Sequence, residues 1–281
     1  MRLAELIEWA WRSNSVIVAY VYGNFGSGKT SYALWTAYEV LGDWGRVLGH
    51  LFFDPAEAAA VMRRAIERRR RLPIVIMDDA GLWLDRMTWW ESEKVAFMQF
   101  FNLIRSVTAG IIFTTPTEEL PKQILRKSMI RVKVEPVGEE RARQQLGDAA
   151  VEAALEAAAR FGVSKQLAIA TGYVVRTLPS FAQLVSKQFY DLYPLHYPIH
   201  EQYETKRHRA LKHYFEKWSA MIGRRHSFES YRERIAELLS RGAAKREIAR
   251  MLRSEGVPKA TAYYWIRLVE EGLSAAEHQT K

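Results

Sequence analysis

The chain has 281 residues, of which 48% are hydrophobic and 26% charged, and its formal net charge is +9. This composition is that of a globular protein and excludes the disordered and fibrous classes. The absence of cysteine excludes disulfides and cysteine-based zinc sites, and no apolar run approaches the roughly 18 residues needed to span a bilayer. We therefore expect an intracellular, cytoplasmic protein of one large domain or of one medium and one small domain.

The positive charge is concentrated in the last part of the chain. Residues 201–281 contain 17 Lys and Arg against 11 Asp and Glu, a net of +6, and the first 200 residues carry the remaining +3. A basic segment behind a nearly neutral body favours a polyanionic partner, most simply nucleic acid. A basic surface without a partner fits the charge equally well.

Strand and helix patterns alternate through the first part of the chain. After an amphipathic helix in residues 1–12, nearly continuous apolar strands are predicted at residues 16–23, 46–53, 73–80, 110–116 and 129–137. Helices are predicted at residues 29–41, 55–71, 91–107, 117–128 and 147–162. This alternation predicts an α/β fold, with a parallel sheet covered by helices on both faces.

The rest of the chain divides into a short irregular part, a connector and a tail. Residues 173–194 are interpreted as a strand, a turn at Pro179-Ser180 and an irregular apolar stretch. We predict a first domain in residues 1–200, a charged helical connector in residues 201–227, and a domain of three short helices in residues 228–281.

A glycine-rich turn separates the first predicted strand from the helix that follows it. The turn is a complete Walker A motif, made of Gly23, Asn24, Phe25, Gly26, Ser27, Gly28, Lys29 and Thr30. Its backbone N–H groups and the start of the next helix suit a phosphate. Lys29 is expected to reach the β- and γ-phosphates of ATP, and the Thr30 hydroxyl to bind Mg²⁺.

Two carboxylates follow the apolar run of residues 73–77, as in a Walker B strand. Asp78 is the candidate for holding Mg²⁺, and Asp79 for orienting the water that attacks the γ-phosphate. Aspartate is one methylene shorter than the glutamate common at this position. Slow hydrolysis, or help from Glu91 or Glu93, is therefore an alternative, and a carboxylate that merely caps a turn is another.

The strand at residues 110–116 ends in two threonines, Thr114 and Thr115. A hydroxyl at this edge of the sheet can bind the γ-phosphate or the attacking water. The sequence does not show which of Thr114 and Thr115 does so. Threonines placed there for their strand propensity alone are the alternative.

The motifs GNFGSGKT, IVIMDDAG and IIFTTP occur in this order with a helix between each pair. Residues 15–137 thus resemble the additional-strand class of P-loop ATPases, which includes the AAA+ proteins, and the chain is similar to ATPases of archaeal plasmids and viruses. The resemblance implies a sheet with the third motif's strand between the other two. It also implies homo-oligomers with ATP at the subunit interfaces and an arginine reaching across, for which Arg126 is the candidate and Arg131 the second choice. The helical lid of AAA+ proteins, with its second sensor arginine, is not evident.

The tail has the apolar spacing of three helices. Its residues 245–267 resemble the helix-turn-helix of resolvases, transposases and many regulators, in which the last helix lies in the major groove of double-stranded DNA. The expected DNA contacts are Lys245, Arg246 and Arg250 with phosphates, and Lys259, Thr261, Tyr263, Tyr264 and Arg267 with bases. A three-helix module that binds protein is the alternative.

These patterns predict an ATPase that acts on double-stranded DNA in replication initiation, partition, transposition or packaging of a plasmid, virus or mobile element. Two alternatives remain. One is a transcriptional regulator switched by nucleotide with negligible turnover. The other is an assembly ATPase whose tail binds protein.

Overall fold

The computed structural model describes residues 1–80, 104–116, 129–177, 183–223 and 228–279. These residues form two compact units, Met1–Ala210 and Leu211–Lys281, each of which is described by itself. Within the described residues, no helix combines the length and the apolar character that a membrane crossing requires.

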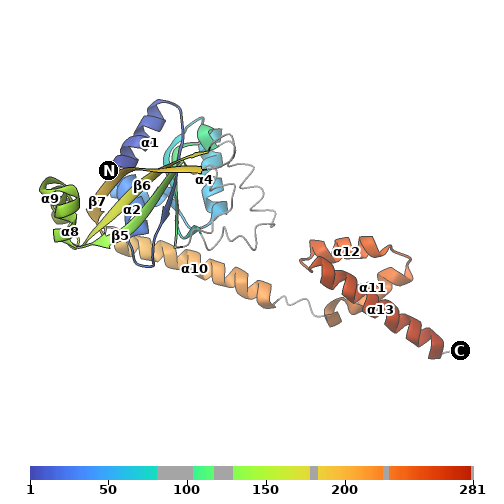
Figure 1. Ribbon diagram of the computed structural model, residues 1–281. Coiled ribbons are helices and arrows are strands. Elements are labelled where there is room, and N and C mark those ends of the chain that lie inside the picture. The colour runs from blue at the N-terminus through green and yellow to red at the C-terminus, as the bar shows by residue number, and fades with distance from the viewer. Residues whose placement is uncertain (81–103, 117–128, 178–182, 224–227, 280–281) are drawn as a thin grey trace. The chain divides into compact units, whose positions relative to one another are not determined.

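The first unit is built on a sheet with the strand order β2-β3-β4-β1-β5-β6-β7 (Figure 1). The strands are β1 (Ile17–Tyr22), β2 (Leu51–Phe52), β3 (Leu72–Met77), β4 (Thr108–Thr115), β5 (Ile130–Val137), β6 (Leu167–Thr177) and β7 (Gln183–Pro194). Pairing is parallel from β2 to β5, whereas β6 and β7 are added antiparallel. The predicted α/β class is confirmed, but the sheet is mixed rather than wholly parallel.

Helices cover both faces of this sheet. They are α1 (Arg2–Arg12), α2 (Lys29–Leu41), α3 (Trp44–Val47), α4 (Pro55–Glu67), α8 (Glu139–Leu146), α9 (Asp148–Arg160) and the first part of α10 (His200–Gly223). Alternate residues of β1 face opposite ways: Ala19 and Val21 pack with α1 and α2, and Val18 and Tyr20 with the cluster that includes α4. The continuous apolar runs of the sequence are explained by this double covering.

Two predicted segments differ from the structure. Residues 46–53 were expected to be one strand, but only Leu51–Phe52 is extended, because the Asp43 side chain accepts a hydrogen bond from the Arg46 N–H at 2.8 Å and caps the helical turn α3. The apolar stretch expected to be irregular is the long strand β7, which pairs with β6 around a bulge at Gly172/Tyr173. The predicted helix in residues 117–128 and most of that in residues 91–107 lie outside the described residues.

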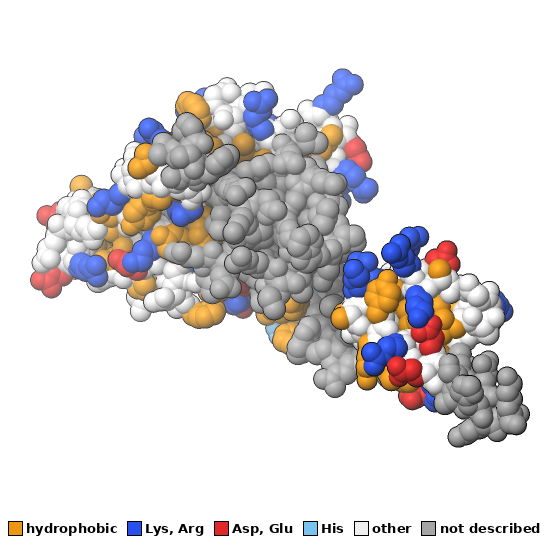
Figure 2. Space-filling view, turned by 45° about the vertical axis from the view of Figure 1, so that its right-hand side comes forward, with side chains coloured by type: hydrophobic (Ala, Val, Ile, Leu, Met, Phe, Trp, Pro, Cys, Tyr) orange, Lys and Arg blue, Asp and Glu red, His pale blue; other side chains and the backbone are white. Residues whose placement is uncertain are grey.

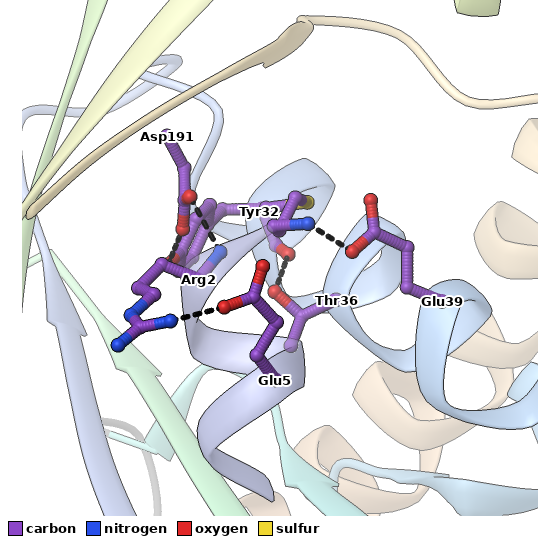
Figure 3. Close-up of polar contacts among 7 residues, drawn as sticks. Arg2, Glu5, Tyr32, Thr36, Glu39 and Asp191 are labelled. Atoms are coloured by element: carbon purple, nitrogen blue, oxygen red, sulfur yellow. Dashed lines mark hydrogen bonds and ion pairs between the residues drawn. The ribbon is translucent and has the colours of Figure 1, made fainter. Parts of the chain in front are cut away.

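The added strand β7 fixes the helix that follows the phosphate loop. Asp191, a buried residue of β7, accepts hydrogen bonds from the Arg2 N–H at 2.7 Å and from the Tyr32 hydroxyl at 2.8 Å (Figure 3). Burial and the charge of Asp191 raise the pKa of Tyr32, so the phenol remains a donor. One carboxylate thereby joins β7, α1 and α2 behind the site described below.

The second unit contains α11 (Phe228–Ser240), α12 (Lys245–Ser254) and α13 (Lys259–Gln279). Its core combines Ile235, Ile248, Ala249, Leu252, Val257, Ala262, Trp265, Ile266 and Val269. The tail thus contains three helices, the number predicted from its apolar spacing, although α13, with 21 residues, is longer than the short helix expected. Figure 2 shows Lys and Arg side chains over this unit, interspersed with acidic ones.

Candidate nucleotide-binding site

The phosphate loop, residues 23–30, runs from the end of β1 to the start of α2. Gly28 caps α2 with a φ of +93°, a conformation that other residues rarely adopt. An added Cβ there would lie 2.6 Å from Leu195 Cδ1, and one on Gly23 would lie 2.4 Å from the Val134 carbonyl oxygen. Gly23 and Gly28 are therefore required both by the turn and by the segments packed against it.

Two polar side chains of the phosphate loop, those of Lys29 and Ser27, are at least partly buried. Lys29 Nζ donates to the carbonyl oxygens of Gly23 at 3.0 Å and Asn24 at 2.7 Å. Burial lowers the pKa of Lys29, and the charges of Asp79 and Asp78 partly oppose that shift. Ser27 Oγ is buried and has no hydrogen-bond partner within the described residues, a polar atom that a bound anion would satisfy.

Asp78 lies directly after β3, facing Thr30. The Thr30 hydroxyl is 3.1 Å from Asp78 Oδ1 and 3.2 Å from Oδ2. Thr114 also donates to Oδ1, and the Tyr203 hydroxyl donates to Oδ2 at 2.8 Å. The carboxyl is fully buried, and burial and the charge of Asp79 raise its pKa, although these hydroxyl bonds favour the ionised form.

Asp79 has a different environment from its neighbour. Its φ of +50° is unusual for a residue other than glycine, and its N–H donates to Thr114 Oγ1 at 3.1 Å. Its Oδ2 accepts a hydrogen bond from Arg207 Nε at 3.1 Å and forms an ion pair with Arg207 Nη2 at 3.1 Å. The carboxylate predicted to orient water is thus held by a cation.

The sheet brings most of the predicted catalytic residues of the first unit to one edge. Thr114 lies beside Val21 in the register of β4 on β1, which places the third motif's strand between the other two, as the resemblance implies. Thr114 contacts both aspartates, and Thr115 is equally buried. Arg126, Glu91 and Glu93 lie outside the described residues, and Arg131 Nη2 donates to Gln183 Oε1 at 2.7 Å.

Two residues of this site were not predicted from the sequence, Tyr203 and Arg207 of α10. Both lie in the segment expected to be a connector. The available signal was their spacing, since Ile199, Tyr203 and Arg207 recur every four residues and so share one side of a helix. The sequence around Tyr203 and Arg207 does not indicate that either residue contacts an aspartate.

A pocket of about 640 Å³ lies on the β5–β7 side of the phosphate loop. Its walls are the end of β5 with residues 136–139, the segment before β6 with residues 164–167, and Leu195. Leu195 is the residue that an added Cβ on Gly28 would touch, so one wall of the pocket lies beside the loop. Volumes of this order suit small-molecule ligands.

Magnesium is compatible with this arrangement. Thr30 and Asp78 offer a hydroxyl and a carboxylate oxygen to the same point, and P-loop proteins hold Mg²⁺ with these two groups, water and the nucleotide's phosphates. The described residues contain no group of three or more His, Asp or Glu suited to a metal. A cation held mainly by the protein is therefore not indicated in that part of the chain.

The residues predicted at DNA lie on α12 and α13, which pack against each other in the core of the second unit. Lys245 forms an ion pair with Glu270 at 2.8 Å and Arg267 with Glu271 at 3.0 Å. The other predicted residues lie at the surface, with Thr261 half-buried: Arg246, Arg250, Lys259, Thr261, Tyr263 and Tyr264. The solvent-exposed aromatic ring of Tyr264, with 55% of its surface accessible, is available to a partner.

No protein-family model matches the chain. Among curated proteins, it is 36% identical to uncharacterized protein B-251 of Sulfolobus spindle-shape virus 1 over 134 residues, 42% of this chain and 53% of that protein. It is 29% identical to uncharacterized protein ORF286 of Acidianus two-tailed virus over 119 residues, 41% of this chain and 42% of that one. The chain thus spans about half the length of the curated relatives it matches.

Solved structures show a weaker likeness. The genome packaging NTPase B204 of Sulfolobus turreted icosahedral virus 2, in complex with AMPPCP, has a TM-score of 0.34 and 9% identity over 62% of this chain and 98% of that one. A chain of the E. coli MS115-1 HORMA:CdnC:Trip13 complex has a TM-score of 0.35 and 15% identity over 57% of this chain and 72% of that one. Because these TM-scores are low, the fold is assigned from the strand order and the phosphate loop themselves.

Proposed function

We propose that this chain binds and hydrolyses ATP with Mg²⁺ and acts on double-stranded DNA. The observation that carries the nucleotide part is the approach of Thr30, at the start of α2, to the buried Asp78, directly after β3, at 3.1 Å. A Walker A loop whose hydroxyl meets a Walker B carboxylate is the arrangement with which P-loop proteins hold a nucleoside triphosphate and its metal.

In this proposal the triphosphate and the nucleoside of ATP lie on two different sides of the phosphate loop. The triphosphate would lie along the loop's N–H groups and Lys29, with its terminal phosphate toward Asp78, Asp79 and Thr114. The nucleoside would then occupy the pocket beside Leu195, on the opposite side. A bound Mg²⁺ would neutralise phosphate charge in the transition state, and Thr30 and Asp78 are the groups that would hold it.

The DNA part rests on the second unit. The support is the charge of +6 in residues 201–281, together with exposed basic and aromatic residues on two packed helices. Phosphate contacts would position the unit, and residues near the start of α13 would read bases. Both curated relatives are viral proteins, which favours replication, partition, transposition or packaging of a viral or mobile genome. Subunits sharing ATP at their interfaces, with Arg126 reaching across, complete the proposal.

One observation favours a second function, a regulator that binds ATP with little turnover. The Asp79 carboxylate is bound on Oδ2 by Arg207, and a carboxylate oxygen engaged by a cation is less available to orient the attacking water. In that case the bound nucleotide would change DNA affinity without being consumed. An assembly ATPase whose tail binds protein would instead show no salt-dependent affinity for DNA.

Turnover with and without double-stranded DNA tests these possibilities, with Lys29→Ala as the blank. A rate that depends on Lys29 and rises several-fold with DNA is expected for the proposed function. ATP binding with turnover at the level of the blank in both conditions would establish the switch instead. If the wild-type chain does not bind ATP, or binds it no better than Lys29→Ala does, the nucleotide site is refuted.

A further inference from the structure

The helix α10 packs one side against the edge of the sheet that carries the two aspartates. Tyr203 is buried, with 3% of its surface exposed, and its ring packs against Phe53 and Tyr197 at centroid distances of 5.7 and 5.6 Å. Lys206 donates to the carbonyl oxygens of Leu48 at 2.9 Å and Leu51 at 2.5 Å. These contacts fix α10 at the end of β2, next to β3.

We propose that α10 is a working part of the nucleotide site, in which Tyr203 and Arg207 are positioning residues for Asp78 and Asp79. This inference rests on the proposed ATP-binding function. It adds residues that the Walker motifs do not contain, from a segment about 125 residues farther along the chain, as the separations of 125 and 128 positions show.

Tyr203 supplies the bond that sets the orientation of the Asp78 carboxylate. Thr30 contacts both oxygens of Asp78 and Thr114 only Oδ1, so the Tyr203 bond to Oδ2 at 2.8 Å distinguishes the two oxygens. With Oδ1 held by Thr114 and Oδ2 by Tyr203, the carboxylate is fixed with both oxygens within reach of Thr30. Because the group is fully buried, water cannot replace a lost donor, and the cost of removing it is large.

Arg207 acts in the same way on Asp79. Its Nε and Nη2 both lie 3.1 Å from Oδ2, so that, among the residues the structure describes, Oδ1 is the oxygen left to accept a hydrogen bond from water. The positive charge also compensates for the proximity of two carboxylates at adjacent positions. The Arg207 and Asp79 side chains are 39% and 24% exposed, so this pair is less shielded than Tyr203 and Asp78 and can rearrange more readily.

Tyr203→Phe tests the proposal most directly, because it removes one oxygen atom and keeps the ring. The matched control is Tyr197→Phe, which makes the same change in the ring that packs edge-on against Tyr203. Binding of the non-hydrolysable analogue AMPPCP to the full chain would be measured by calorimetry in Mg²⁺ and in EDTA. Melting in EDTA establishes that each variant is folded.

The gain in AMPPCP affinity on adding Mg²⁺ should fall about tenfold or more in Tyr203→Phe, the scale of a lost bond to a charged group. Affinity in EDTA should change little, and Tyr197→Phe should match the wild type. If Tyr203→Phe retains the full gain, or if Tyr197→Phe loses as much, the inference is overturned while ATP binding stands. If the wild-type chain itself shows no Mg²⁺-dependent binding, the proposed function fails first.

Arg207 has its own measurement, which separates position from stability. Arg207→Gln should lower kcat for ATP by up to about a hundredfold, the scale of a misplaced catalytic group, with KM nearly unchanged, and Arg207→Lys should recover part of the loss because a single ammonium can still reach Oδ2. The control is Arg209→Gln, the same change at an exposed position of α10. Equal effects of Arg207→Gln and Arg209→Gln, or no recovery with lysine, would refute the role of Arg207.

Discussion

Thr114 is the residue on which both aspartates depend, and its replacement by valine tests the geometry of the site. Its hydroxyl donates to Asp78 and accepts the N–H of Asp79 at 3.1 Å. Valine has the same shape as threonine but offers neither bond. The side chain is 1% exposed, so solvent cannot take over either function.

The expected cost follows from these two bonds. Losing a hydrogen bond to a buried charge costs about 1.5–3 kcal/mol, and leaving the partly buried Asp79 N–H without an acceptor costs about 1 kcal/mol more. The new methyl group recovers up to about 1 kcal/mol by burial. A net loss of about 1.5–4 kcal/mol should lower the melting temperature of the first unit by about 3–16 °C, at about 2–4 °C per kcal/mol for a unit of this size.

Calorimetric melting of the nucleotide-free chain measures this loss, with Thr115→Val as the companion variant on the same strand. We expect Thr114→Val to lose also the stabilisation that Mg²⁺ and AMPPCP give, whereas Thr115→Val keeps it. If Thr114→Val melts within about 1 °C of the wild type, the two bonds contribute nothing and the described geometry of the aspartates is wrong. Loss of ligand stabilisation only in Thr115→Val would assign the role to the other threonine.

Three further predictions concern the pocket and the second unit. Ser164→Trp, at an exposed position lining the pocket, should weaken ATP binding and leave tripolyphosphate binding unchanged in competition titrations, because it fills only the space for the nucleoside. Trp265→Ala should cost about 3–5 kcal/mol and abolish the separate melting of the second unit by circular dichroism, because Trp265 is buried and stacks on Tyr231 at 5.6 Å. Lys259→Ala should reduce the slope of log DNA affinity against log salt by about 1; an unchanged slope would remove Lys259 from the interface.

The parts of the fold that were predicted correctly depend on local patterns. Strands β1, β3 and β4 are nearly continuous apolar runs, β5 alternates apolar with charged residues over most of its length, and the phosphate loop is defined by spacing alone. Glycine and lysine positions within eight residues are sufficient to specify a turn that binds phosphate. The order β3-β4-β1 followed from the resemblance, because the sequence of motifs along the chain is characteristic of the class.

The errors arose where a distant or competing contact decides the structure. Residues 46–53 have strand-forming valine, leucine and phenylalanine, but the Asp43 cap shifts the balance to a helical turn. In β7, residues 183–188 are exposed and only the later ones reach the core. The sequence therefore lacks a regular alternation there, and the strand exists because β6 pairs with it.

Tyr203 and Arg207 of α10 show why only part of a site can be predicted from the sequence. Walker motifs are recognised because their residues are adjacent, whereas Tyr203 and Arg207 reach the aspartates only once the sheet has formed. A charged segment between two domains is interpreted as a connector because its few apolar residues bury little surface. Here the buried positions of that segment are used for polar contacts with the site. The same helix continues from His200 to Gly223, past Leu211, where the second unit begins. A change in either aspartate on binding Mg²⁺ and nucleotide would therefore reach Tyr203 and Arg207 of α10 first.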